Sequence, residues 1–117
     1  MNRKNAWSAI LLSIFLYACK SVENKMLPGT YAFRGENWPD TIKIFNNNTY
    51  EHFSYQDGKR LVNKGKWTFN TRQVTFKNFT FFNGGDGLWI STVELSAENK
   101  VKLIYASDSD MYFEQIN

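Results

Sequence analysis

Few side chains in this sequence are of the types that carry out catalysis, and their pattern is not that of an enzyme. The single histidine, His52, lies between Glu51 and Phe53 in an alternating segment. General base catalysis by such a histidine needs a nucleophile within reach. The sequence has no Gly-x-Ser-x-Gly, Walker or His-Glu-x-x-His motif. We therefore expect a structural or solvated His52 and no catalytic residue.

The acidic side chains fall mostly in expected turns, where carboxylates usually make local hydrogen bonds. Asp108 and Asp110, together with Asp86 in a glycine-rich loop, are of the type that binds Ca²⁺. No Glu closes a 12-residue calcium-binding loop around them. We expect no metal and no cofactor, while a carboxylate pair for glycoside hydrolysis stays open at the level of sequence.

The one cysteine, Cys19, ends a segment that is typical of export. Residues 1–18 are a basic start followed by an apolar run too short to span a bilayer, as in a secretory signal. Leu16 and Ala18 before the cysteine resemble the lipobox of bacterial lipoproteins, although Tyr17 stands where a small residue is usual. The resemblance implies cleavage before Cys19 and lipid on its thiolate. A plain signal peptide with a stray cysteine is the alternative.

Processing at this position changes the charge of the chain. Without residues 1–18, Arg3 and Lys4 are lost and the net charge falls from +3 to +1. A basic surface for nucleic acid is therefore not indicated. We expect residues 19–26 to form the lipidated cysteine and a tether, and residues 27–117 to form one domain without disulfides. The expected location is the bacterial cell envelope, at the outer membrane, on a face that the sequence leaves open.

After residue 26 the sequence alternates between apolar and polar residues in short runs separated by turns, which predicts strands. The expected strands cover residues 28–33, 41–45, 49–55, 61–69, 74–82, 88–95, 101–106 and 111–116. Asp57-Gly58 predicts a type I′ hairpin turn, and slipping alternation near Lys77-Asn78 predicts a bulge. An all-β fold of about eight antiparallel strands follows, either a small up-and-down barrel or a curled meander.

Three short motifs carry a resemblance: Gly29-Thr30-Tyr31, Thr49-Tyr50 after an Asn-rich turn, and Gly65-Lys66-Trp67. Together with the strand pattern they are similar to the small lipocalin-like lipoproteins of Bacteroidetes. The chain departs from true lipocalins in carrying Tyr31 where those have Trp, and it is short for that fold. The resemblance implies a barrel on a lipid tether and does not imply a ligand.

The inward positions are occupied by large side chains, which favours a filled interior. The expected inward residues are Tyr31, Ile42, Ile44, Tyr50, Trp67, Phe69, Phe76, Trp89, Val93 and Leu103. If a small apolar ligand binds, the expected residues are Tyr31, Trp38, Trp67 and Trp89 around one barrel mouth. Trp38 could instead plug the barrel end.

A second set of rings is expected on the outward face, where aromatic residues are unusual. Phe53, Tyr55, Phe79 and Phe81 would there contact a partner protein, unless a bulge or a register error turns them inward. Separately, Asp40-Thr41-Ile42 resembles the O-glycosylation motif of Bacteroidetes and would place a sugar on Thr41.

These observations predict a non-enzymatic, lipid-anchored envelope protein that binds another protein. One alternative is a lipocalin-type carrier of a small apolar ligand. A second is a periplasmic inhibitor or immunity protein that acts against a secreted enzyme.

Overall fold

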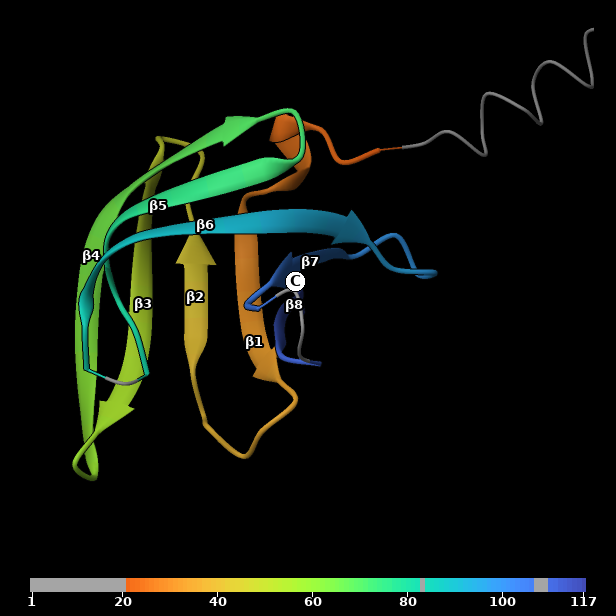
Figure 1. The fold of residues 1–117 in the computed structure, drawn as a ribbon. Coiled ribbons are helices and arrows are strands. Elements are labelled where there is room, and N and C mark those ends of the chain that lie inside the picture. Colours follow the sequence, from red (N-terminus) through yellow and green to blue (C-terminus); the bar gives the residue numbers. More distant parts are fainter. Residues whose placement is uncertain (1–20, 83, 107–109) are drawn as a thin grey trace, which may run out of the picture.

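The computed structural model describes residues 21–82, 84–106 and 110–117, which form a closed barrel of eight antiparallel strands in chain order (Figure 1). The strands are β1 (Gly29–Arg34), β2 (Thr41–Ile44), β3 (Thr49–Gln56), β4 (Lys59–Asn70), β5 (Gln73–Thr80), β6 (Asp86–Leu95), β7 (Val101–Ile104) and β8 (Tyr112–Gln115). The barrel closes where β8 pairs with β1, with Phe33 opposite Phe113. The predicted all-β fold is confirmed, and of its two forms the barrel is the one observed.

The hairpin between β3 and β4 follows from its turn residues. Asp57 and Gly58 have φ angles of 53° and 74°. A type I′ turn needs positive φ at both central residues, and its twist matches that of the flanking strands. The turn sets Gln56 opposite Lys59 and continues this register along the whole of β3. The predicted hairpin is therefore confirmed.

A bulge divides β5 into two parts with different neighbours. The register of β5 against β6 shifts between Phe76 and Phe79, and Asn78 has a φ of 60°. Before the bulge β5 pairs with both β4 and β6, and after it Phe79 and Thr80 pair with β6 alone. The inserted residue reverses the alternation. The prediction that Phe79 faces outward is therefore wrong, because its ring is fully buried.

The interior of the barrel is filled by rings and branched side chains. Of the ten expected inward side chains nine are buried, and Phe69 is half-buried against them. The Phe76 and Trp89 rings stack with centroids 5.0 Å apart, and the rings of Phe79 and Trp89 are 4.7 Å apart. Burial of this apolar surface is the main source of stability in a domain of this kind.

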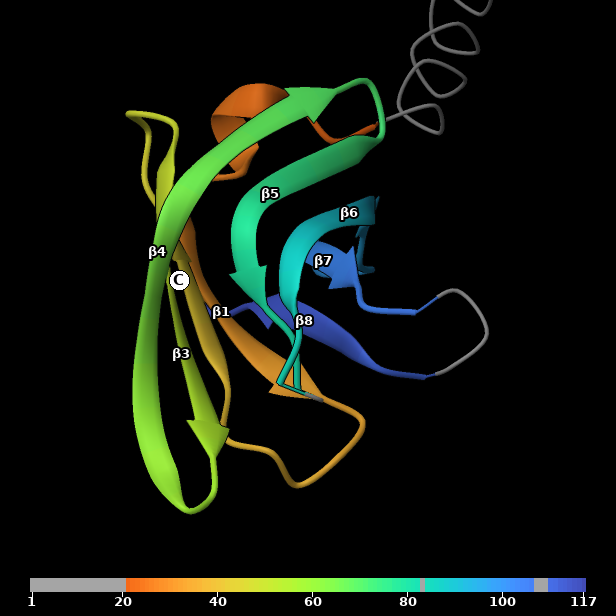
Figure 2. The same ribbon diagram turned by 60° about the vertical axis from the view of Figure 1, so that its left-hand side comes forward.

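The segment before β1 packs on one end of the barrel. A 3-10 helix, η1 (Asn24–Met26), covers that end, and Val22 before it joins the core cluster (Figure 2). The expected tether over residues 19–26 is therefore too long, because the packed part of the chain begins at Val22. Cys19 lies outside the described residues. Among the residues that the structure describes, no helix is long and apolar enough to cross a membrane.

Candidate functional site

The barrel has two ends that differ in what closes them. At the end that we call the tether end, η1 and the turn between β2 and β3 cover the core, and the chain enters there at Ser21 (Figure 1). At the opposite end, the far end, lie the β1–β2 loop, the β3–β4 hairpin and the β5–β6 turn (Figures 1 and 2).

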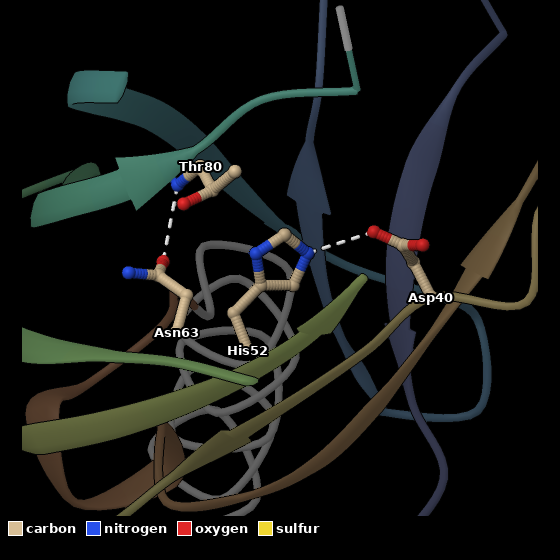
Figure 3. A network of polar contacts seen from close by, with 4 residues as sticks. All are labelled: Asp40, His52, Asn63 and Thr80. Carbon is tan, nitrogen blue, oxygen red and sulfur yellow. Dashed lines mark hydrogen bonds and ion pairs between the residues drawn. The ribbon is translucent and has the colours of Figure 1, made fainter. Parts of the chain in front are cut away.

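A buried acid–histidine pair lies inside the far end. Asp40 directly precedes β2, and His52 is opposite Ile42 on β3. The Asp40 Oδ2 and His52 Nε2 atoms are 2.7 Å apart, and both side chains are almost completely buried (Figure 3). The imidazole stacks on the Phe79 ring with centroids 4.3 Å apart. The bulge that turns Phe79 inward thus also fixes the histidine.

The pair keeps two polar atoms without partners among the described residues. These atoms are Asp40 Oδ1 and His52 Nδ1. The imidazole lies between Asp40 on one side and the contact of Asn63 with Thr80 on the other (Figure 3). No serine, threonine or cysteine in the described part of the chain hydrogen-bonds to His52.

An aromatic layer closes the far end over this pair. Trp38, 45% exposed, stacks on Phe33 with centroids 6.0 Å apart and lies 4.8 Å from Phe82. The Phe82 ring in turn lies 4.8 Å from Tyr105. Burial and the nearby Asp40 carboxylate raise the pKa of the Tyr105 hydroxyl, against a backbone hydrogen bond with Phe82 that lowers it. Trp38 covers the barrel end from outside, as the plug interpretation predicts.

The four residues expected to surround one ligand do not share a mouth. The Tyr31 hydroxyl donates to Leu27 O at 2.6 Å, so this ring faces the tether end. Trp67 Nε1 donates to Phe45 O at 2.9 Å, also at that end. Trp38 lies at the far end, and Trp89 is in the core between them. The prediction of one common mouth is therefore wrong, since antiparallel strands carry these residues to opposite ends.

The predicted partner-binding residues separate into two groups. Phe79 is buried and Phe81 packs against the core. Phe53 and Tyr55 do face outward, and Tyr55 is 43% exposed. The Phe53 ring lies between two cations, with Arg60 Cζ 4.6 Å and Lys43 Nζ 5.6 Å from its centroid.

Sequence reasoning missed Val62, which lies directly opposite Phe53 and is 55% exposed. Counting back from the Asp57-Gly58 turn gives this pairing without a structure. We call the outward residues Phe53, Tyr55, Arg60 and Val62 the hairpin face.

No family model, curated protein or solved structure matches this chain. Its function is therefore inferred from its own geometry.

The remaining predicted sites are placed as follows. Thr41 is half-buried and opposite Phe53, but the Asp40 of its motif is buried against His52. A glycosylating enzyme would therefore reach the Asp40 side chain only in a chain in which β2 and β3 have not yet paired. Asp108 lies outside the described residues, and within them no group of three or more His, Cys, Asp or Glu side chains could hold a metal ion.

Proposed function

We propose that this chain is a lipid-anchored protein of the bacterial cell envelope, at the outer membrane, that binds another protein and does not catalyse a reaction. The observation that carries this proposal is the hairpin face. Tyr55 and Val62 are exposed, and Phe53 is half-buried, on a hairpin that reaches the end of the barrel opposite to Ser21 (Figures 1 and 2). Exposed apolar side chains gathered beside cations are typical of protein interfaces.

The filled interior favours this function over that of a carrier. A carrier needs space for its ligand inside the barrel or at its mouth. Here Phe76, Phe79 and Trp89 lie with ring centroids 4.7 to 5.9 Å apart. Inhibition of a secreted enzyme would be one form of the proposed binding, with that enzyme as the partner.

The anchor is tested by Cys19→Ala in the producing bacterium. We expect the variant to leave the membrane fraction, because acyl chains on Cys19 supply the membrane affinity. Cys19→Ser is the closest control in size and has the same expected outcome. An unchanged membrane fraction in both variants would refute the lipid anchor.

Binding is tested by photo-crosslinking in intact cells. A photoreactive amino acid is placed at Tyr55 or at Val62, and in a control at Glu94, which is exposed on β6. We expect one discrete adduct from the hairpin positions and none from the control. Equal adducts from all three positions, or none from the hairpin, would contradict a partner at the hairpin face.

A further inference from the structure

The long strand β4 changes its neighbour along its length, because it pairs with β3 from Lys59 to Lys66 and with β5 only from Trp67 onward. Residues Trp67 to Asn70 pair with β5, and the first half pairs with β3 on one side. On its other side β5 leaves β4 at the bulge and continues paired with β6 alone. Figure 2 shows the tip of the β3–β4 hairpin extending beyond the β5–β6 turn at the far end, and the Gln56 side chain reaches Gly84 in that turn.

One side chain bridges the opening where β5 leaves. Asn63 Oδ1 accepts a hydrogen bond from Thr80 N at 3.0 Å (Figure 3), and Asn63 Nδ2 donates to Asn78 O at 2.6 Å. The amide side chain thus replaces a strand pairing at this level. Between Asn63 and the hairpin tip, the backbone of Arg60 and Val62 has no hydrogen-bond partner on that side within the described residues.

The hairpin turn determines which backbone groups face this open edge. In antiparallel pairs, residues exchange hydrogen bonds at alternate positions. The two-residue turn makes Gln56 and Lys59 a hydrogen-bonded pair, so Leu61 and Asn63 also bond to β3. Arg60 and Val62 therefore point their N–H and C=O groups away from β3, and both residues are exposed.

We propose that this edge binds an extended, acidic segment of the partner protein, which adds a strand beside β4. The inference rests on the proposed function and names how the partner is held. Unpaired strand edges bind peptides through main-chain hydrogen bonds, with side chains providing specificity. The open edge carries Lys59, Arg60 and Lys64, and Asp57 is the acid at the turn.

The same charges select among occupants. A second copy pairing through this edge would set lysine and arginine against each other, which is unfavourable. An acidic strand of alternating residues would instead place its carboxylates on the face of Arg60 and its apolar side chains on the opposite face, which carries the exposed Leu61. Lys64 is already 3.7 Å from Glu51, so Lys59 and Arg60 are the cations that lack an acidic neighbour in the described ion pairs.

The test uses two synthetic probes, a peptide of alternating Glu and Val and its counterpart of alternating Lys and Val. Each is titrated into the mature protein, purified in detergent from the producing cells, and amide hydrogen exchange is followed. We expect the acidic probe to slow exchange in the β4 segment around Arg60 and Val62, and the basic probe to leave it unchanged. Equal protection by both probes, or by neither, would overturn the proposal.

Val62→Pro isolates the main-chain contribution. Proline removes the Val62 N–H from the open edge, while the β3–β4 ladder keeps its bonds because position 62 is not a bonded pair. We expect affinity for the acidic probe to fall about tenfold or more. Val62→Thr keeps the N–H and a β-branched side chain, and should retain binding. Unchanged binding in the proline variant would contradict strand addition.

Arg60→Glu provides an independent variant if the proline variant fails to fold. It should reverse the preference, so that the basic probe protects β4 and the acidic one does not. If Arg60→Glu leaves the preference for the acidic probe unchanged, the proposal of an acidic segment is overturned. If the hairpin crosslinks to a partner but neither probe protects β4, the proposed function stands and strand addition is refuted.

Discussion

The buried polar groups at the two ends of the barrel differ in how completely they are hydrogen-bonded. At the tether end the Tyr31 hydroxyl, Trp67 Nε1 and Gln115 Nε2 donate to backbone carbonyls that close the core. Towards the far end, Asp40 Oδ1 and His52 Nδ1 are buried without a partner among the described residues. An unpaired buried polar group costs roughly 1–3 kcal/mol. The buried donors named at the tether end are therefore satisfied, whereas the buried pair towards the far end is bonded through one atom of each side chain and keeps two others unpaired.

The largest expected effect is at the tether end, on Trp67. The ring is fully enclosed and its Nε1 is bonded, so Trp67→Ala leaves a cavity and a carbonyl without its donor. We expect a loss of about 3–5 kcal/mol in the free energy of unfolding. Urea denaturation followed by far-ultraviolet circular dichroism measures it. A loss below about 1 kcal/mol would contradict the expectation that the core at the tether end contributes strongly to stability.

The second effect concerns the Asp40–His52 pair. Removing one partner leaves the other buried alone, so Asp40→Ala should lower the free energy of unfolding by about 3 kcal/mol. The double variant Asp40→Ala/His52→Ala should lose less than the sum of the two single variants, by about 1–3 kcal/mol. Urea denaturation of all four proteins completes this cycle. Additive losses would mean that the two side chains are not coupled.

Most of the strand order was predictable, because hairpin turns and alternation are local signals. Asp57-Gly58 and the slip near Lys77 each predict a feature that the structure has. The sequence does not predict which residues after the bulge face the core. One inserted residue exchanges the inward and outward positions of the residues that follow it. For this reason the alternation predicts Phe79 at the surface, whereas its ring lies in the core.

The far end could not be predicted from sequence for a different reason. In the sequence Asp40 has the character of a loop residue, and His52 has no catalytic partner residue near it. The two are 12 residues apart along the chain. Their contact depends on the pairing of β2 with β3 and on the inward turn of Phe79. By the same argument the open edge of β4 follows from where β5 leaves, which no local pattern in β4 reveals.

The third effect is a loss of stability in alkali. Burial raises the pKa of Tyr31 and of Tyr50 far above the ordinary tyrosine value. Both hydroxyls therefore stay protonated in the folded protein at a pH where the unfolded chain loses its protons. The contribution is fully present below pH of about 10 and is lost above it, at up to about 1.4 kcal/mol per pH unit for each tyrosine.

The midpoints of urea denaturation, measured from roughly pH 8 to 11.5, should decrease as this contribution is lost, because that range spans the ordinary pKa of tyrosine. Tyr31→Phe removes one of the two groups and should make the decline shallower, at the cost of its hydrogen bond, about 1 kcal/mol at neutral pH. Midpoints that do not change above pH of about 10 would show that these rings are not protected from solvent.

The smallest effect is expected at the far end, on Trp38. This ring lies over Phe33 and Phe82 from outside and is nearly half exposed, so Trp38→Ala removes contacts without opening an enclosed cavity. We expect a loss of about 1 kcal/mol or less in the free energy of unfolding, measured by the same urea denaturation as for Trp67→Ala. Because the two substitutions are chemically identical, their difference measures the contrast between the ends directly. Equal losses would mean that Trp38 is part of the core and that both ends are closed alike.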